Sequence, residues 1–390
     1  MVSSCLDSMY IIGEFMHEQI YEGGFSGLTY IPNTEYEFFT VTDRGPNTSL
    51  KKLLGKDGIM LFPFPDYTQK IIRLRYAENT IQLVSVHPIL GSDGDPISGF
   101  PANRTFDTNI EIPSIDLAGT KPADKRWKFD LEGISVDTNG DLWLVDEYLP
   151  SLLHIDGKTF KIKKRFSAEA DTDSFMLPEY FAMRQPNRGF EGVSITPSGK
   201  IVAILQSPLN TPELLDSIPN RLVRILHLDP VSGATKTFGY ELSADIVDPK
   251  IGGMAAINEH EFLIIEHGKN SSGKVANIFK IDLEYATNID EIYFNASTSF
   301  EGLKNNAKAQ YYGIILAQKS HFFDLIQAGF NSDFGKPEGI AVIDSSTFSV
   351  VNDNDFGIDK VDKKGKLIMN SQPSCIYIFK FNQPVFNVVK

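Results

Sequence analysis

The sequence predicts an all-β protein built from repeated four-stranded antiparallel sheets. One pattern returns along the chain: a small or acidic residue, a glycine, a short β-rich run, a turn and a second β-rich run. The clearest copy starts with Asp130-Leu-Glu-Gly-Ile-Ser-Val and continues through 141–148, 152–156 and 161–166, which read as four short strands. The composition supports a large folded core, since 42% of the 390 residues are hydrophobic and 22% are charged.

Further copies of the pattern set the predicted number of sheets. Clear copies begin at 190 and 337, and degenerate copies lie at 25–30 and 251–256. The marker glycines are spaced by 106, 59, 61 and 86 residues, at Gly27, Gly133, Gly192, Gly253 and Gly339. The two short spacings fit one sheet with its loops, and the two long spacings contain insertions or a hidden sheet. We therefore predict a single β-propeller of five or six four-stranded blades.

The ends of the chain are expected to close the ring. Residues 9–15 form an orphan strand, and the last copy has only its first two strands plus 375–381. Antiparallel pairing of these two terminal strands would complete one blade and hide a sheet edge. That pairing places Cys375 near residue 15 and Cys5 beyond residue 381, so we expect no disulfide. The predicted domains are a tail at 1–8 and a propeller at 9–390, with insertions near 88–128 and 284–312.

Charge and hydropathy limit the partners and the location. The formal net charge of −13 argues against a nucleic-acid partner. No apolar run reaches 18 residues, so no transmembrane segment is expected. Val2-Ser-Ser-Cys5 matches the end of a bacterial lipoprotein cleavage box, which suggests a lipoprotein attached through Cys5; the alternative is a polar tail. We expect a monomer.

Three glutamates hold equivalent positions in three copies of the repeat: Glu132, Glu191 and Glu338. In a propeller the first strands line the channel, so these carboxylates should converge. Together they would repel one another unless a cation or protons neutralise them. Calcium suits such hard oxygen ligands, with Asp353 as a fourth candidate ligand. The alternative is that each glutamate accepts backbone hydrogen bonds at a blade junction.

The ends of the second strands supply further polar residues for one mouth of the channel. We take Glu147, His267 and Asp355 as candidate catalytic groups, since carboxylates and imidazole move protons. Candidate ligands for an anionic substrate are Asp43, Arg44, Asn47, Arg188 and Lys336. The alternative interpretations are solvated turns and an ordinary ion-pair network, with His267 as a satisfied channel residue.

Seven short segments resemble a known family when taken in order: 24–28 (GFSGL), 42–47 (TDRGPN), 130–135 (DLEGIS), 143–148 (WLVDEY), 189–193 (GFEGV), 337–341 (PEGIA) and 352–357 (NDNDFG). The chain resembles the bacterial phytase-like family, also called "esterase-like activity of phytase". The resemblance implies an exported propeller hydrolase, periplasmic or extracellular. It also implies a small anionic phosphate or carboxylate ester as substrate and a metal in the channel. Ser26 and Gly252 stand where other copies have glutamate, unlike the acidic calcium ring of alkaline phytases.

Three functions remain open from the sequence. The first is a metal-assisted phosphoesterase-like or esterase-like hydrolase. The second is a calcium-dependent lactonase-like hydrolase, and the third is a non-catalytic propeller that binds a ligand or protein.

Overall fold

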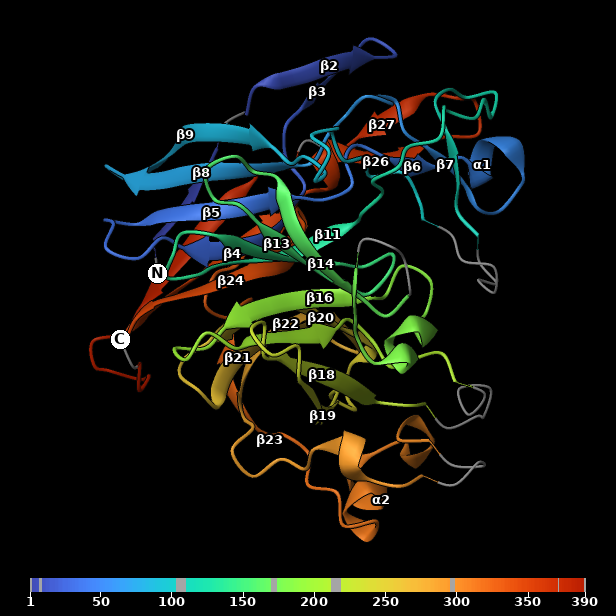
Figure 1. Cartoon of the computed structure of the whole chain (residues 1–390). Helices are drawn as coiled ribbons and strands as arrows, with labels where there is room; N and C mark the ends of the chain where they lie inside the picture. The colour runs from blue at the N-terminus through green and yellow to red at the C-terminus, as the bar shows by residue number, and fades with distance from the viewer. Residues whose placement is uncertain are drawn as a thin grey trace.

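The computed structural model describes residues 2–6, 9–102, 110–169, 174–211, 219–294, 299–370 and 372–388. Within these residues strands dominate, and five antiparallel sheets of four core strands form the main body (Figure 1). The prediction of an all-β protein is therefore confirmed. Among the described helices none is both long and apolar enough to cross a bilayer, and the longer α-helix, α2 (Asn306–Tyr311), has six residues.

Four of the sheets follow chain order from their first strand to their last, and the fifth also takes the N-terminal strand. The first sheet contains β4 (Phe25–Tyr30), β5 (Glu37–Thr42), β8 (Lys70–Ala77) and β9 (Thr80–Pro88). The second contains β11 (Leu131–Val136), β12 (Leu142–Asp146), β13 (Ser151–Ile155) and β14 (Ile162–Ser167), with β15 (Phe175–Met176) added in parallel. The third contains β16 (Phe190–Ile195), β17 (Ile201–Leu205), β18 (Leu222–Leu228) and β19 (Thr235–Glu241). The fourth contains β20 (Val247–Ala256), β21 (Glu261–Asn270), β22 (Gly273–Asp282) and β23 (Gln318–Asp324). The fifth contains β24 (Lys336–Asp344), β25 (Thr347–Asp353), β28 (Cys375–Lys380) and β1 (Val2–Cys5).

The first strands of the five sheets touch one another in a cycle. β4 contacts β11, β11 contacts β16, β16 contacts β20, β20 contacts β24, and β24 contacts β4. The marker glycines allow this approach: a Cβ placed on Gly339 would lie 2.5 Å from the backbone nitrogen of Leu28, and one on Gly27 would lie 2.9 Å from that of Ile134. No side chain fits at such a distance, which explains the glycine of every repeat.

Apolar cores fill the spaces between neighbouring sheets. Val41 and Ile71 of the first sheet pack in one cluster with Leu144 of the second. Similar clusters join the second, third and fourth sheets, then the fourth and fifth, and then the fifth and first. Each sheet therefore buries its apolar faces against its neighbours, as small repeated sheets must.

The chain ends close the fifth sheet, as predicted, but the N-terminal strand is a different one. β1 pairs antiparallel with β28, whereas β2 (Ile11–Phe15) pairs with β3 (Glu18–Tyr21). Cys5 lies directly opposite Cys375, and the two form a disulfide. The expectation of no disulfide was wrong because it assigned the closing role to residues 9–15. In this state the Cys5 sulfur is not available for a lipid.

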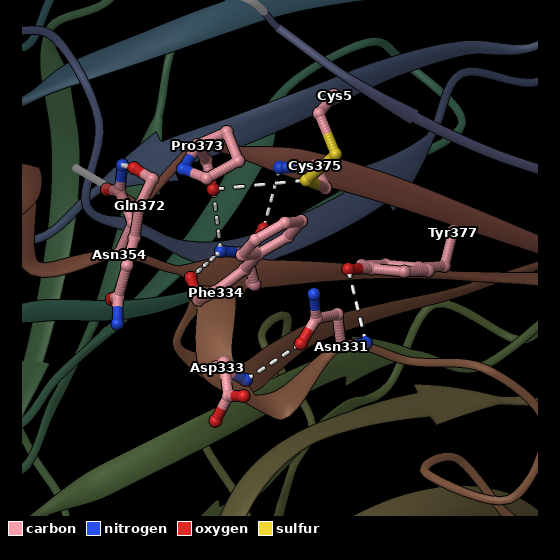
Figure 2. Close-up of a disulfide and its surroundings, with 10 residues drawn as sticks. Cys5, Asn331, Asp333, Phe334, Asn354, Gln372, Pro373, Cys375 and Tyr377 are labelled. Atoms are coloured by element: carbon pink, nitrogen blue, oxygen red, sulfur yellow. Dashed lines mark hydrogen bonds between the residues drawn. A yellow bond between two sulfur atoms is a disulfide. The ribbon is translucent and has the colours of Figure 1, made fainter. Parts of the chain in front are cut away.

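The disulfide lies beside a network that reaches the end of β25 (Figure 2). The side chain of Asn352 accepts a hydrogen bond from the Cys375 nitrogen at 2.6 Å and donates to the carbonyl oxygens of Phe334 and Pro373. Asn354 accepts from the Gly24 nitrogen at 2.9 Å and donates to the carbonyl of Gln372. The residue between these two asparagines is therefore held from both sides.

Several short elements outside the five sheets gather in the upper part of the body as drawn, whereas α2 lies at the bottom (Figure 1). They share an apolar cluster that includes Ile20, Leu50, Leu61 and Phe356. The elements are β2, β3, β6 (Thr48–Ser49), α1 (Lys51–Leu54), β7 (Ile59–Leu61), β10 (Ile112–Ser114), β26 (Ile358–Val361) and β27 (Leu367–Met369). Short 3₁₀ segments occur at Glu179–Met183, Ile289–Glu291, Glu301–Leu303, Ser332–Phe334 and Asp355–Gly357. The spacing of 106 residues thus holds β6, α1, β7 and β10, and the spacing of 86 residues holds, at 284–312, α2 with two 3₁₀ turns.

We predict that the disulfide contributes to stability by closing the ring. Replacing both cysteines, Cys5→Ser with Cys375→Ser, should lower the free energy of unfolding by about 2–5 kcal/mol, because the unfolded chain is no longer cross-linked. Urea unfolding checks this. A reductant should bring the wild-type protein to the variant's midpoint and leave the variant unchanged; equal stability of both proteins without reductant would contradict the prediction.

Candidate functional site

A polar cavity of about 250 Å³ lies where the first and second strands of the sheets converge. Its walls carry carboxylates, amides and cations from all five sheets, and β26 contributes two residues at one edge. The lining residues are Asp43, Arg44, Asn47, Asp130, Glu132, Glu147, Asn187, Glu191, Gln206, Lys250, His267, Lys336, Glu338, Asp355, Ile358 and Asp359.

The strand register explains why these residues meet. In each sheet the pairing of the first two strands shifts by one residue just before the marker glycine, as between Leu131 and Gly133. The unpaired bulge residue is Ser26, Glu132, Glu191, Gly252 or Glu338. A β-bulge redirects a side chain and bends its strand. The bulge therefore brings the three glutamates to one cavity.

Two more sets of equivalent positions complete the walls. At each second strand, one residue follows the partner of the residue before the bulge: Asp43, Glu147, Gln206, His267 or Asp353. Two residues before each bulge come Gly24, Asp130, Gly189, Lys250 and Lys336. Ten of the sixteen lining residues hold one of these three repeat positions.

Three carboxylates form the tightest acidic group, namely Asp43, Asp130 and Glu132, with one oxygen of each within 4.8 Å of the others. Asp130 is 1% exposed, and its buried Oδ1 accepts no hydrogen bond from the described residues. Burial raises the pKa of Asp130 to about 7, against the opposing effect of Arg44. Burial and the neighbouring Glu191 raise the pKa of Glu132. A proton or a cation is needed to hold this group together.

Arg44 is fixed by several partners at the edge of the acidic group. Its Nη1 lies 2.8 Å from Glu111 Oε2 and donates to the Tyr148 hydroxyl at 3.0 Å and to Asn187 Oδ1 at 3.1 Å. The same nitrogen lies 3.6 Å from Asp130 Oδ2. Arg44 thus orients Asp130, and its charge is already shared among protein acceptors.

Lys336 takes up the charge of a second acidic group. Its Nζ lies 3.1 Å from Glu338 Oε1, 2.8 Å from Asp353 Oδ2 and 3.6 Å from Asp355 Oδ1. Burial raises the pKa of Glu338 to about 8, although Lys336 opposes the rise. Two of the four predicted calcium ligands therefore have a lysine as counterion.

Gln206 joins two further carboxylates. Its Nε2 donates to Glu147 Oε1 at 2.9 Å and to Glu191 Oε2 at 2.8 Å. Glu147 is 1% exposed, and burial raises its pKa to about 7, against the lowering effects of Arg44 and Lys250. A carboxylate with a pKa near neutrality can exchange a proton with a substrate.

Lys250 and His267 form the remaining wall. His267 is 9% exposed, and burial lowers its pKa to about 3, with help from Lys336 and Lys250. Its imidazole is therefore neutral at neutral pH and offers one N–H donor and one acceptor.

The structure brings ten of the twelve predicted site residues to this cavity. Asp353 lies next to it through Lys336, but Arg188 turns away and forms a two-pronged ion pair with Asp248 at 2.9 Å. Six lining residues were not predicted from the sequence: Asp130, Asn187, Gln206, Lys250, Ile358 and Asp359. Asp130 and Lys250 share the repeat position of Lys336, and Gln206 shares that of Glu147, so alignment of the repeats could have found three of the six.

The family model described as "Phytase-like: Esterase-like activity of phytase" matches residues 20–356. A curated relative, an "Uncharacterized secreted protein" of Arthroderma benhamiae, is 26% identical over 250 residues, which cover 54% of this chain and 48% of the relative. The chain thus spans about half the length of that relative.

Solved structures overlap with this chain only loosely. A structure from the GH130 family of mannoside phosphorylases has a TM-score of 0.41 at 9% identity and covers 97% of this chain and 92% of its own. A luciferin-regenerating enzyme reaches 0.36 at 10% identity, with 93% and 78% covered. A gluconolactonase from Xanthomonas campestris reaches 0.33 at 9% identity, with 97% and 98% covered. Overlap this low carries no information about activity.

We predict that the buried carboxylates make the cation-free protein less stable as pH rises from 6.5 to 8.5. Asp130, Glu147 and Glu338 have folded pKa values of about 7, 7 and 8, well above their ordinary values. The folded state therefore binds more protons than the unfolded state, and the stabilisation is lost as pH passes the folded pKa. His267 has a lowered pKa, so it makes the free energy of unfolding rise with pH, but mainly below pH 6.5, the ordinary pKa of histidine in the unfolded chain.

Urea unfolding of cation-stripped protein at several pH values in this window measures the slope. Glu338→Gln removes one of the titrating groups and should make the slope shallower. A free energy of unfolding that stays level or rises over the window would contradict the prediction.

Proposed function

This chain belongs to the phytase-like family, and on that premise we propose that it is a five-bladed β-propeller hydrolase that cleaves phosphate or carboxylate esters in the cavity. The observation that carries the proposal is the group of Asp43, Asp130 and Glu132, three carboxylates within 4.8 Å beside a carboxylate whose pKa lies near neutrality, Glu147. Such groups supply a cation site and a proton acceptor, the two needs of ester hydrolysis.

The cycle of contacts supports five blades. Five first strands touch in the order of the chain, and Gly339 of the fifth sheet reaches the Gly27–Leu28 backbone of the first. The spacing of 106 residues between Gly27 and Gly133 then contains one blade with its insertions and, among the described residues, no second blade.

The acidic group fits a divalent cation such as calcium. Its donors are all carboxylate oxygens from two neighbouring sheets, and Asp130 Oδ1 is buried without a hydrogen bond within the described structure. Asp43, Asp130 and Glu132 would hold the ion, which is a different set from the Glu132, Glu191, Glu338 and Asp353 expected from the sequence. When bound there, a cation would polarise the ester oxygen and lower the pKa of water in the cavity.

The other residues of the cavity have separate roles in the proposed reaction. Glu147 is our candidate for the base that removes a proton from the attacking water, and Gln206 fixes its carboxylate from one side. Arg44 holds Asp130 in place. His267, which is neutral at neutral pH, could donate a hydrogen bond to a substrate oxygen without adding charge. Asp355 lies beside Lys336 at the open edge, where it can exchange protons with solvent.

The disulfide supports an exported protein. Cysteine pairs persist in oxidising compartments and are rare in the cytosol. Cys5 and Cys375 are joined in this structure, and the curated relative from Arthroderma benhamiae carries the name of a secreted protein. A periplasmic or extracellular location follows from both observations.

We predict that calcium raises the melting temperature and that Asp130→Asn abolishes the rise. The ion binds only the folded protein, so a hundredfold excess over Kd should add about 2.7 kcal/mol of stability. Glu338→Gln is the matched control, because Lys336 already neutralises that carboxylate, and it should keep the calcium response. Thermal unfolding with added calcium or chelator measures both. Loss of the response in Glu338→Gln but not in Asp130→Asn would instead favour the ligands expected from the sequence.

We predict that Glu147→Gln lowers kcat by about 10²- to 10⁴-fold, since the amide cannot accept a proton. It should also abolish the limb near pH 7 of the pH–rate profile. The exposed Glu179→Gln serves as the control and should leave rates unchanged. A panel of phosphomonoesters, carboxylic esters and lactones is assayed with and without chelator. Turnover of lactones alone would favour the lactonase-like alternative, and no turnover at all would favour a binding propeller.

A further inference from the structure

We propose that Lys250 and His267 form an oxyanion-binding subsite that selects compact, negatively charged substrates. The proposal rests on the proposed function for the identity of the ester, but the subsite itself can be tested by binding alone. Its ligand is a phosphate or carboxylate group, and its place is the wall of the cavity formed by the fourth sheet.

Lys250 is the cation of the lining whose ammonium lies in no ion pair with the described residues, although its charge opposes the rise that burial causes in the pKa of Glu147. Within the described chain its ammonium also makes no hydrogen bond. Arg44 and Lys336, the other two strong cations of the lining, are bound to protein carboxylates. Arg188, which the sequence suggested as an anion ligand, is bound to Asp248 outside the lining. Among the described residues of the lining, Lys250 is therefore the cation that a ligand can bind without displacing a paired carboxylate.

His267 strengthens the same wall. The side chain is 9% exposed and lines the cavity, and neither ring nitrogen has a hydrogen-bond partner among the described residues. A ligand oxygen beside Lys250 could accept a hydrogen bond from the N–H of the neutral imidazole.

The repeat places this wall apart from the acidic group. Lys250 lies two residues before the bulge of β20. Asp130 holds the same repeat position before the bulge of β11. One sheet lies between them in the cycle, and it contributes Glu191 and Gln206 to the lining. A substrate can therefore present its free anionic oxygens to Lys250 while its ester bond faces Asp130 and Glu132.

The size of the cavity limits the ligand. At about 250 Å³ it is smaller than the 300–1,000 Å³ typical of sites for drug-sized molecules. The cavity suits one phosphate or carboxylate group with a few attached atoms, and a larger substrate would leave its remainder outside. Neutral esters and lactones lack the group that Lys250 would bind, so they should bind more weakly.

The test compares two lysine variants in binding inorganic phosphate and acetate by calorimetry. Lys250→Met keeps the stem of the side chain and removes the charge. Lys269→Met removes a charge from the exposed part of the same sheet, outside the lining. The full-length protein is first stripped of divalent cations on a chelating resin, so that anions cannot bind through a metal.

We expect the wild-type protein and Lys269→Met to bind at least one of the two anions. We expect Lys250→Met to bind it at least about tenfold more weakly, the effect of losing one charge-assisted hydrogen bond. The anion that binds more tightly identifies the substrate group as phosphate or carboxylate. Equal binding by Lys250→Met and wild type, or no binding of either anion by the wild type, would overturn the proposal.

Kinetics separate this proposal from the proposed function. If an anionic and a neutral ester are both hydrolysed, Lys250→Met should raise KM for the anionic ester and leave that for the neutral ester unchanged. If no ester is hydrolysed, the proposed function fails, while the calorimetry still decides whether Lys250 binds an oxyanion. A misfolded Lys250→Met protein would be recognised by its circular dichroism, and Lys250→Gln then replaces it in the same titrations.

Discussion

The close approach of five first strands is the constraint on which the structure depends. At Gly339 and Gly27 a Cβ would fall within 3 Å of backbone atoms of the next sheet, so these positions tolerate only glycine. The approach forces each strand to bulge one residue earlier, and the bulge turns that residue into the cavity. The repeated glycine therefore positions the glutamates that precede it, and the fold and the site have one geometric cause.

Convergence of equivalent positions creates an electrostatic problem that each part of the cavity solves differently. Around Glu338 and Asp353 the solution is a lysine, Lys336. Between Glu147 and Glu191 it is an amide donor. At Asp43, Asp130 and Glu132 the described protein supplies the Arg44 guanidinium, 3.6 Å from Asp130, and the Arg44 backbone N–H, which donates to Asp43. An uncompensated carboxylate group in a buried site is costly. That difference marks the last group as the place for a cation.

The sequence predicted the repeat, the all-β class and the convergence of most site residues, because glycine and acidic markers recur at fixed offsets. It could not identify the closing strand, since both 2–5 and 9–15 can form strands and only packing decides between them. It also could not assign counterions. Lys336 and Arg188 lie at similar distances before a Glu-Gly pair, yet one enters the cavity and the other pairs with Asp248 near the start of β20, 60 residues further along the chain.

Closure of the ring and the chemistry of the cavity are joined in the fifth sheet. Asn352 binds the backbone beside Cys375, and Asn354 binds the Gly24 nitrogen of the first sheet. Asp353 lies between them and pairs with Lys336, which also holds Glu338. The hydrogen bonds of Asn352 and Asn354, which lie where the fifth sheet closes, therefore also hold Asp353 and its partner Lys336 in the cavity wall. Because Lys336 is committed to these carboxylates, its charge is shared with the protein, and this is why we propose Lys250 of the neighbouring sheet as the group that binds an anion.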